Sequence, residues 1–310
     1  MKKNYHFYAI ITIIFWALAF VFTKLTLQYF DVYSLSFLRY FSASLTLIVM
    51  IFFMKINKPK KEDFLIYLFS GTIGFSIYVI LFTKGAGMVS SATGSIVIAM
   101  VPVFTALFSS IFYNEKLKTY QWFAIGIEFI GILVLTLMNG IFSINEGVLW
   151  LLLAALCLAT YNLLQRKLTK KYTAIEASTY SIFIGTVFLF IFAPRAIQKT
   201  IVAPIEQLVY VSILGIFSSA LAYIFWAKAI SLAEKTTYVS NYMFVTPFLT
   251  TILGFIMMGE VPDYSTILGG IIILTGLFLF NKESFLEPYR NKKLANTEFI
   301  SCTDEDNLIE

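Results

Sequence analysis

Long uncharged apolar segments recur along most of this chain of 310 residues. A helix needs about 20 mostly apolar residues to cross the hydrocarbon core of a bilayer. Nine runs carry no charged residue, and a tenth is interrupted by Glu128. The runs are 7–23, 40–54, 64–83, 85–114, 119–139, 147–165, 177–194, 207–227, 236–259 and 264–281. Backbone groups in lipid must bond within their own segment, so each run is predicted to be a helix.

Composition supports the same conclusion. Hydrophobic residues make up 59% of the chain and charged residues 13%, whereas a soluble domain carries about 25% charged residues. We therefore expect an all-α integral membrane protein with ten transmembrane helices, whose first helix is too long for a signal peptide and is retained. One histidine and two cysteines predict neither a metal site nor a disulfide framework. We expect no cofactor and no nucleic-acid partner. The expected partners are the lipid bilayer, which surrounds the helices, and a small-molecule substrate.

The positive charges fall mostly on one side of the predicted bundle. With ten spans, the loops that share a side with the two termini hold most of the 23 basic residues, whereas the opposite loops hold only Arg195 and Lys199. Lys24, Arg39 and Lys84 lie near the outer ends of helices. The positive-inside rule then predicts that both termini lie in the cytoplasm. We expect a multi-pass protein of the plasma membrane.

The two halves of the sequence correspond to each other. Four pairs of residues lie 145 positions apart: Tyr78 and Tyr223, Pro102 and Pro247, Glu115 and Glu260, and Gly131 and Gly276. Each half contains five spans, and an odd number places the second half in the opposite orientation. These features predict inverted repeats, which are typical of secondary transporters.

This repeat predicts the organisation of the chain. We expect a first repeat of spans one to five at residues 7–139 and a second repeat of spans six to ten at 146–281. Residues 1–6 are expected to be a short cytoplasmic segment. Residues 282–310 are polar and end in an acidic run, so a disordered cytoplasmic tail is expected there.

Two of the paired residues are prolines within apolar runs. Pro102 and Pro247 fall near the middle of spans four and nine, where proline removes a backbone hydrogen bond and kinks the helix. Free carbonyl groups near the membrane midplane would result. Proline is also common in membrane helices generally, but two matched positions favour a functional role.

These features resemble the drug/metabolite transporter superfamily, specifically its ten-helix EamA-type members, over about residues 7–281. The motifs are Trp16-Ala17 with Lys24, Leu38-Arg39-Tyr40, Pro102 with Asn114-Glu115 and Gln121-Trp122, and Pro247 with Gly259-Glu260. The resemblance implies two EamA domains and a central cavity lined by spans one to four and six to nine. It also implies transport, often efflux, of amino acids and related metabolites. The sequence departs from the family pattern at Asn114, where glycine is common, and at Leu158, where many members have tryptophan.

Polar residues within the spans are the candidates for function. The candidate substrate-binding residues are Trp16, Arg39, Tyr78, Asn162, Tyr223, Trp226 and Asn241. Aromatic rings with a polar tip could line a cavity, although they also occur in interfacial belts. Lys24, Lys84 and Lys228 are candidates for charged groups at the mouths of the pathway. Snorkelling to the headgroups or favourable interaction with a helix dipole would explain these lysines equally well.

Glu128 is the one carboxylate deep within a predicted span. Such a group could couple transport to protons, because burial favours its protonated form. Its repeat partner is Ile273, however, and span five is expected at the periphery. A role in packing, in a dimer contact or as a protonated structural acid is therefore favoured. Whether the protein is a monomer or a homodimer stays open.

The leading functional hypothesis is a secondary transporter that exports small organic metabolites, with amino acids the best expectation. Import or exchange of an anionic or phosphorylated metabolite is the main alternative. A channel is disfavoured because inverted repeats with midplane prolines are typical of alternating access. A membrane-embedded enzyme is disfavoured because one histidine and one deep carboxylate cannot form a catalytic constellation. The absence of buried Asp or His residues favours facilitated diffusion or exchange over proton drive.

Overall fold

A computed structural model describes residues 5–53, 56–113, 117–137, 145–233, 236–280 and 282. Over these residues the regular structure is entirely helical, without β-strands. Eight helices have the length and apolar composition needed to cross a membrane. Two further apolar helices, Thr119–Val134 and Tyr264–Phe280, are shorter. All ten apolar runs thus form helices over their described residues, and eight of these helices meet the length and hydropathy expected of a membrane span there.

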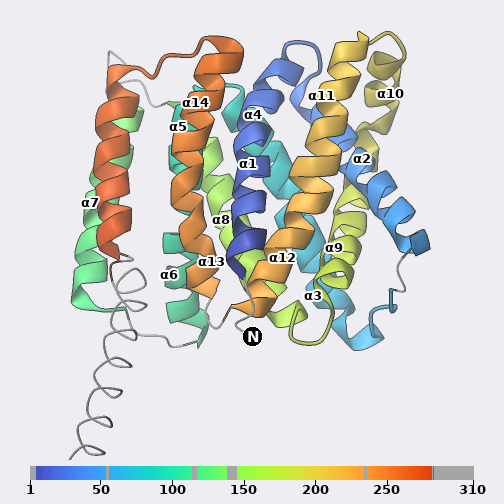
Figure 1. Cartoon of the computed structure of the whole chain (residues 1–310), viewed down its shortest axis with the longest axis horizontal. Coiled ribbons are helices and arrows are strands. Elements are labelled where there is room, and N and C mark those ends of the chain that lie inside the picture. Colours follow the sequence, from blue (N-terminus) through green and yellow to red (C-terminus); the bar gives the residue numbers. More distant parts are fainter. Residues whose placement is uncertain are drawn as a thin grey trace, which may run out of the picture.

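The first half of the chain, residues 5–137, forms its helices in sequence order. They are α1 Tyr5–Leu27, α2 Val32–Phe53, η1 Lys61–Asp63, α3 Phe64–Gly71, η2 Thr72–Ile77, α4 Tyr78–Ala86, α5 Ser91–Ile98, α6 Val101–Tyr113 and α7 Thr119–Leu137. The chain turns from α1 to α2 at one end of the bundle, which we call the Lys24 end. The opposite end, where α1 begins, is the His6 end (Figure 1).

The second half, residues 145–282, repeats this order of helices. They are α8 Glu146–Leu168, α9 Ala174–Leu189, η3 Phe190–Phe192, α10 Ala193–Ile201, α11 Ile205–Gly215, η4 Ile216–Leu221, α12 Ala222–Leu232, α13 Thr236–Ser240, η5 Asn241–Val245 and α14 Thr246–Met258. The helix Tyr264–Phe280 follows. Residues 283–310, which include nearly all of the expected tail, lie outside the described residues.

A π-helical turn interrupts the third long helix of each half. The turns η2 and η4 have six residues each and begin 144 positions apart. Each follows a glycine that permits close helix contact. A Cβ on Gly71 would lie 2.7 Å from the carbonyl oxygen of Ser181, and a Cβ on Gly215 would lie 2.9 Å from that of Arg39. Each π-helical turn therefore packs against the second helix of the other half, and π-helical turns often mark functional positions.

The fourth long helix of each half is interrupted next to its proline. α5 ends at Ile98 and α6 begins at Val101, directly before Pro102. In the second half, α13 is followed by the 3₁₀ segment η5, which ends one residue before Thr246 and Pro247. A proline lacks the N–H that would continue the α-helical ladder, which accounts for both interruptions.

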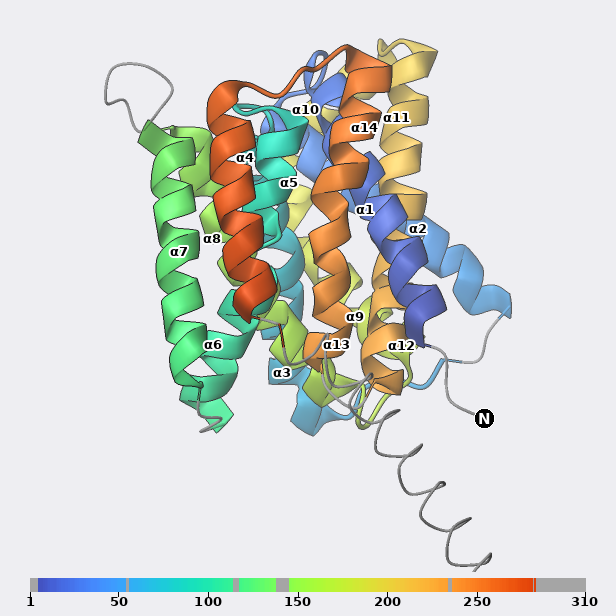
Figure 2. The same ribbon diagram turned by 60° about the vertical axis from the view of Figure 1, so that its left-hand side comes forward.

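Helices of the two halves are interleaved in the bundle (Figures 1 and 2). α1 packs against α11, α12 and α14, whereas α4 packs against α8. α7 and the helix Tyr264–Phe280 lie together at one edge of the bundle, in both views. Their contact is close, because a Cβ on Gly131 would lie 2.5 Å from Ile273 and one on Gly276 would lie 2.6 Å from Glu128.

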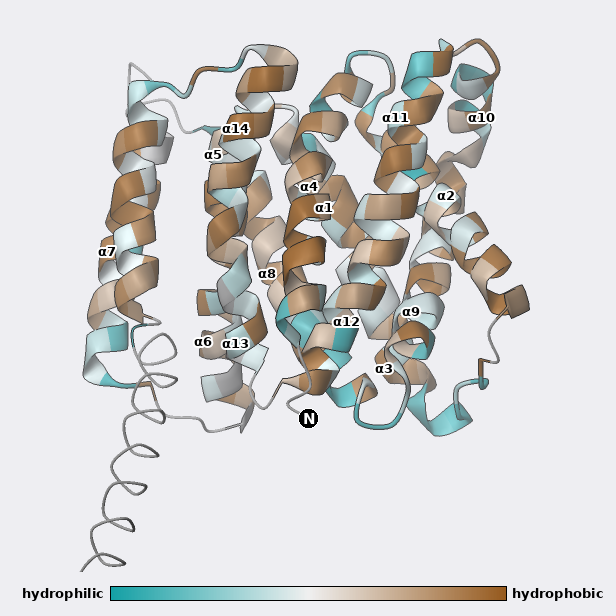
Figure 3. Cartoon of the chain, viewed as in Figure 1, coloured by the Kyte–Doolittle hydropathy of each residue, from teal (hydrophilic) through white to brown (hydrophobic). Residues whose placement is uncertain are grey.

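The outward faces of the helices are apolar over much of their length, and hydrophilic residues gather near the two ends (Figure 3). Large apolar side chains are exposed on many helices, including Phe53 at 85%, Phe123 at 68% and Ile256 at 71%. Water would not solvate such a surface favourably, whereas lipid would. The chain is therefore a multi-pass membrane protein.

Candidate functional site

A small cavity lies where helices of both halves meet. Its lining residues are Trp16, Ala19, Phe20, Arg39, Tyr78, Phe82, Ile98, Leu158, Met243 and Thr246. The cavity measures about 20 Å³, which is room for one or two water molecules. A metabolite would need the helices to move apart before it could enter.

Arg39 is the one charged side chain in this lining. It is 1% exposed, and its Nε donates a hydrogen bond of 2.7 Å to Ser219 Oγ on η4. The guanidinium carbon lies 5.6 Å from the centre of the Phe82 ring and 5.8 Å from that of Tyr40. Its Nη1 has no hydrogen-bond partner among the described residues. The sequence suggested a position near a helix end, but α2 begins at Val32, so Arg39 lies two turns inside the helix.

Aromatic rings form one wall of the cavity and continue behind it. Trp16 and Tyr78 line the cavity directly. The Trp16 ring centre lies 5.4 Å from Tyr223 and 4.8 Å from Trp226, and both of these residues are fully buried. Tyr223 and Trp226 therefore support the wall rather than form it in this closed arrangement.

Asn162 is engaged by Trp226 and does not line the cavity. The indole Nε1 of Trp226 donates a hydrogen bond of 3.0 Å to Asn162 Oδ1, and both side chains are fully buried. This bond satisfies two polar groups away from water, which is a structural role. The side chain of the remaining substrate-binding candidate, Asn241, lies outside the described residues.

The two helix interruptions adjoin the cavity. Pro102 and Pro247 cannot donate the α-helical hydrogen bonds to the carbonyl groups four residues earlier, which belong to Ile98 and Met243. Both of those residues line the cavity. The carbonyl oxygen of Met243 accepts the N–H of Thr246 instead, so it is not left free as the sequence suggested. The interruptions thus give each half a hinge-like break beside the site.

The Lys24 end of the bundle is closed beside α1 by an ion pair. Lys24 Nζ pairs with Glu260 Oε1, and Glu260 Oε2 accepts the backbone N–H of Ser91 at 2.8 Å. Partial burial alone would raise the pKa of Glu260, but the hydrogen bonds from Lys24 and Ser91 outweigh it and lower the pKa. A more open hollow of about 270 Å³ lies outside this contact, lined by residues that include Lys24, Ser90 and Asp263.

The other two lysine candidates do not face the cavity. Lys84 Nζ lies 3.8 Å from the centre of the Trp150 ring, a cation–π contact between α4 and α8. Lys228 is exposed near the end of α12. Glu115, the expected counterpart of Glu260, lies outside the described residues.

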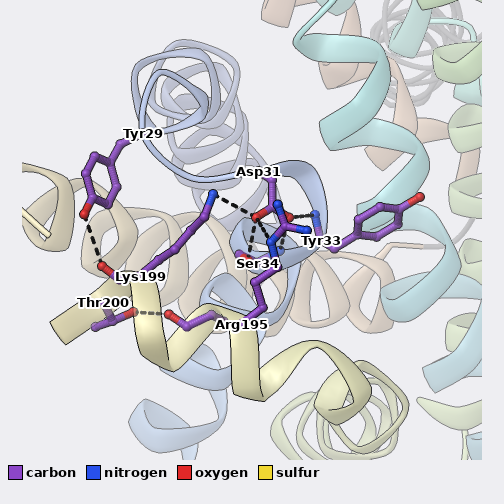
Figure 4. A network of polar contacts seen from close by, with 8 residues as sticks. Tyr29, Asp31, Tyr33, Ser34, Arg195, Lys199 and Thr200 are labelled. Atoms are coloured by element: carbon purple, nitrogen blue, oxygen red, sulfur yellow. Dashed lines mark hydrogen bonds and ion pairs between the residues drawn. The ribbon is translucent and has the colours of Figure 1, made fainter. Parts of the chain in front are cut away.

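At the Lys24 end, a second cluster joins the halves (Figure 4). Asp31 Oδ2 lies 3.1 Å from Arg195 Nε and 3.0 Å from Lys199 Nζ, both on α10. Asp31 also caps α2, because its carboxylate accepts the N–H of Ser34 at 3.1 Å and its hydroxyl at 2.8 Å. Arg195 and Lys199 are the two basic residues that the sequence places in the loops with few charges. They hold the connection between α1 and α2 through Asp31.

At the His6 end, the loops of the two halves are joined in a similar manner. Asp63 accepts hydrogen bonds from Lys171 at 2.7 Å and from Tyr172 at 2.9 Å. Glu176 caps α9 together with Thr173 and accepts the backbone N–H of Asn57 at 2.8 Å. The carboxylates at both ends of the bundle therefore join segments of the two halves.

Glu128 on α7 is fully buried, and neither carboxylate oxygen has a hydrogen-bond partner among the described residues. Its Cγ faces Gly276 on the helix Tyr264–Phe280. It does not line the cavity. An unpartnered buried carboxyl is far more stable protonated than ionised, so Glu128 fits a neutral packing residue. Within the described residues, no group of three or more His, Cys, Asp or Glu side chains could hold a metal ion.

Sequence reasoning missed most of the apolar lining. Phe20, Phe82, Ile98 and Met243 line the cavity, yet they carry no polar group that distinguishes them from lipid-facing residues. For Ile98 and Met243, the available signal was their position four residues before the paired prolines. Ser219, the partner of Arg39, was also missed because serine is common in membrane helices.

Curated relatives match nearly the whole chain. A probable terminal-alkyne amino-acid exporter of Streptantibioticus cattleyicolor is 26% identical, over 89% of this chain and 92% of the exporter. The transporter YdfC of Bacillus subtilis, whose substrate is not described, is 26% identical over 92% of each chain. An S-adenosylmethionine uptake transporter of Rickettsia felis is 26% identical, over 81% of this chain and 83% of the relative.

A solved crystal structure superposes on this chain with a TM-score of 0.61, covering 90% of this chain and 96% of the other. At 14% identity, this likeness shows the fold alone. The sequence profile of the EamA-like transporter family matches twice, at residues 3–137 and 145–282. The profile matches both halves of the chain, and the similar curated proteins are transporters. The chain is therefore a member of the EamA-like transporter family, within the drug/metabolite transporter superfamily.

Proposed function

We propose that this protein is a secondary transporter that exports amino acids or related small metabolites by alternating access. The observation that carries this proposal is the small cavity around Arg39, which is lined by helices of both halves. Polar contacts between the halves lie at both ends, including Lys24 with Glu260 and Lys171 with Asp63. A site between two halves, with breakable contacts above and below, is the arrangement that alternating access requires.

The transporter would have ten spans arranged as two inverted repeats, at residues 7–139 and 146–281. The π-helical turns η2 and η4 support this arrangement, because each packs against the second helix of the opposite half. The matched interruptions beside Pro102 and Pro247 support it as well. In this arrangement α7 and its equivalent, the helix Tyr264–Phe280, are the peripheral fifth and tenth spans.

The His6 end would face the cytoplasm, with the protein in the plasma membrane. Basic residues of three connections lie at this end, among them Lys58, Lys118 and Lys170. At the Lys24 end, the basic residues of α10 are paired with Asp31. This asymmetry is the one that the positive-inside rule describes.

Export of an amino acid or a related compound has the best support among the substrates. The relative from Streptantibioticus cattleyicolor is a probable amino-acid exporter. Import or exchange of another metabolite is the second candidate, because the Rickettsia relative is an uptake transporter for S-adenosylmethionine. A phosphorylated substrate has less support, since the cavity lining holds the single cation Arg39.

Metabolite comparison can test the function while the substrate is still unidentified. A deletion strain and an overexpressing strain of the native host would be compared for metabolites inside and outside the cells. For an exporter, one compound should accumulate inside the deletion strain and outside the overexpressor. The purified protein in proteoliposomes should then show counterflow of that compound. Ohmic single-channel currents without counterflow would instead identify a pore.

A further inference from the structure

We propose that Arg39 binds the carboxylate of the transported molecule, and that the substrate is a small monocarboxylate with a compact apolar or aromatic body. This inference rests on the transport function proposed above and deepens it. Free amino acids, hydroxy acids and oxo acids share this chemistry.

The first argument is the unbalanced charge at the site. Arg39 is 1% exposed and forms no ion pair with an Asp or Glu among the described residues. α1, α2 and α4, which line the cavity beside it, contain no acidic residue at all. A buried charge without a counter-charge is strongly unfavourable. An anion in the cavity would offset that cost.

The second argument is the set of donors that Arg39 still has to offer. Ser219 accepts from Nε, whereas Nη1 is buried and unpartnered within the described structure. Phe82 and Tyr40 hold the guanidinium in place through their rings. A planar guanidinium with a free terminal nitrogen suits a carboxylate, and the resulting charge-assisted hydrogen bonds are strong.

The third argument concerns the other cations near the pathway. Lys24 is neutralised by Glu260, and Lys84 is stacked on Trp150. Arg39 is the one cation in the cavity lining, so it balances one negative charge. A phosphate ester carries between one and a half and two charges at neutral pH and would leave an excess. One positive charge therefore favours a monocarboxylate over a phosphorylated metabolite.

The fourth argument is the chemistry of the surrounding wall. Apart from Arg39, most of the lining is apolar or aromatic. Its aromatic members are Trp16, Phe20, Tyr78 and Phe82. Such walls bind apolar groups by dispersion and exclusion of water. A carboxylate on Arg39 would thus leave the rest of a compact molecule against apolar side chains.

Binding can be tested without transport and with simple probes. The purified full-length protein in detergent would be melted in the presence of about 10 mM isovalerate, phenylacetate or L-leucine. The matched amides isovaleramide, phenylacetamide and L-leucinamide, which lack the carboxylate, would serve as ligand controls. We expect at least one carboxylate to raise the apparent melting temperature by about 2 °C or more, and its amide to have no such effect.

Three variants assign the effect to Arg39. Arg39→Gln should abolish the carboxylate-dependent shift, whereas Arg39→Lys should retain binding with about tenfold weaker affinity, because a lysine keeps the charge but loses the planar fork. Lys84→Gln removes a neighbouring cation outside the cavity and should keep the full shift. Each shift is measured against the same variant without ligand, so a change in basal stability does not confuse the result.

Several results would overturn the proposal. They are stabilisation by the amides as well as the acids, an undiminished shift in Arg39→Gln, loss of the shift in Lys84→Gln, or no stabilisation by any carboxylate. Counterflow in proteoliposomes is a separate readout. Carboxylate binding without counterflow would refute the transport function but keep the site, whereas counterflow of a compound without a carboxylate would keep transport and refute the carboxylate assignment.

Discussion

Lys24 on α1 forms an ion pair with Glu260, which follows α14, and so joins the first helix of one half to the fourth long helix of the other. Glu260 also accepts the N–H of Ser91 at the beginning of α5. Three segments that surround the cavity therefore meet at one carboxylate. If these helices separate when the site opens, this contact must break.

Neutralising this pair should open the Lys24 end more often. A partly exposed ion pair contributes about 1 kcal/mol, which corresponds to about a fivefold change in population. In a background without Cys157 and Cys302, Ala19→Cys would report on the cavity. Lys24→Gln or Glu260→Gln should raise its labelling by a membrane-impermeant maleimide about fivefold in intact cells. Equal acceleration by the control Lys84→Gln, or no acceleration in either variant, would contradict a gating role.

Asp31 should make stability depend on pH in the acid range. Partial burial alone would raise the pKa of Asp31, but hydrogen bonds from Ser34 and the charge of Lys199 outweigh it and hold the pKa at about 2. Since the pKa of an unfolded aspartate is about 3.9, the folded state binds this proton less readily. The stabilisation is present above about pH 4 and is lost as the pH falls towards 2.

Asp31→Asn should therefore flatten the acid side of the stability profile. Arg195 is largely exposed and solvent screens the charges, so the expected loss at neutral pH is about 1 kcal/mol. Melting temperatures measured between pH 3 and about pH 7 should differ most at the neutral end, and the difference should narrow steadily towards the acid end. A constant difference across that range would show that the charge of Asp31 is not the cause.

The contact between α7 and the helix Tyr264–Phe280 should not tolerate a methyl group. A Cβ on Gly131 would lie 2.5 Å from Ile273 Cγ1 and 3.0 Å from the carbonyl oxygen of Gly269. Gly131→Ala should destabilise the protein by about 1–3 kcal/mol through overpacking. Gly126→Ala on the same helix is the matched control, because nothing lies within 4 Å of its Cβ. That control should be neutral or slightly stabilising, and equal melting temperatures for the two variants would refute the close contact.

The bond between Trp226 and Asn162 should act on stability rather than on substrate affinity. Trp226→Phe removes the donor and leaves a buried amide oxygen unpaired, at a cost of about 1–3 kcal/mol. Asn162→Leu leaves the indole N–H unpaired in turn. The double variant should cost less than the two single costs combined. A rise in KM that greatly exceeds the loss of stability would instead place one of these side chains in contact with substrate.

Glu128 should not drive accumulation of substrate. It is buried against Gly276, away from the cavity, and has no hydrogen-bond donor among the described residues. Glu128→Gln preserves the shape of a protonated carboxyl, so transport and melting temperature should both stay close to those of the unmodified protein. Accumulation driven by a pH gradient in proteoliposomes, and lost in Glu128→Gln, would show that this residue couples transport to protons.

The sequence predicted the helices well because their signal is local. An apolar run of span length in lipid has one way to bond its backbone, so runs such as 147–165 could be read directly. The helix α7 also forms at the expected place, over Thr119–Leu137. The π-helical turns η2 and η4 could not be predicted, because they depend on the helices against which Gly71 and Gly215 pack.

The candidate site was predicted in part, through polar residues alone. Trp16, Arg39 and Tyr78 line the cavity, whereas Asn162 and Trp226 bond to each other. Their spacing along the chain gives no means to tell these outcomes apart. Whether a buried polar group faces a cavity or a partner depends on neighbours that are distant in sequence.

The sequence by itself determined that lipid surrounds this protein, where its helices form and that its two halves correspond. Apolar runs, basic loops and paired prolines can all be read from the chain without knowledge of its contacts. The tertiary structure decided what each polar group does. It placed Lys24 against Glu260 and Lys84 over Trp150, and left Arg39 in the cavity without a counter-charge. The physical reason is that a charge in a low-dielectric interior is governed by its nearest partners, and packing between the two halves brings those partners together.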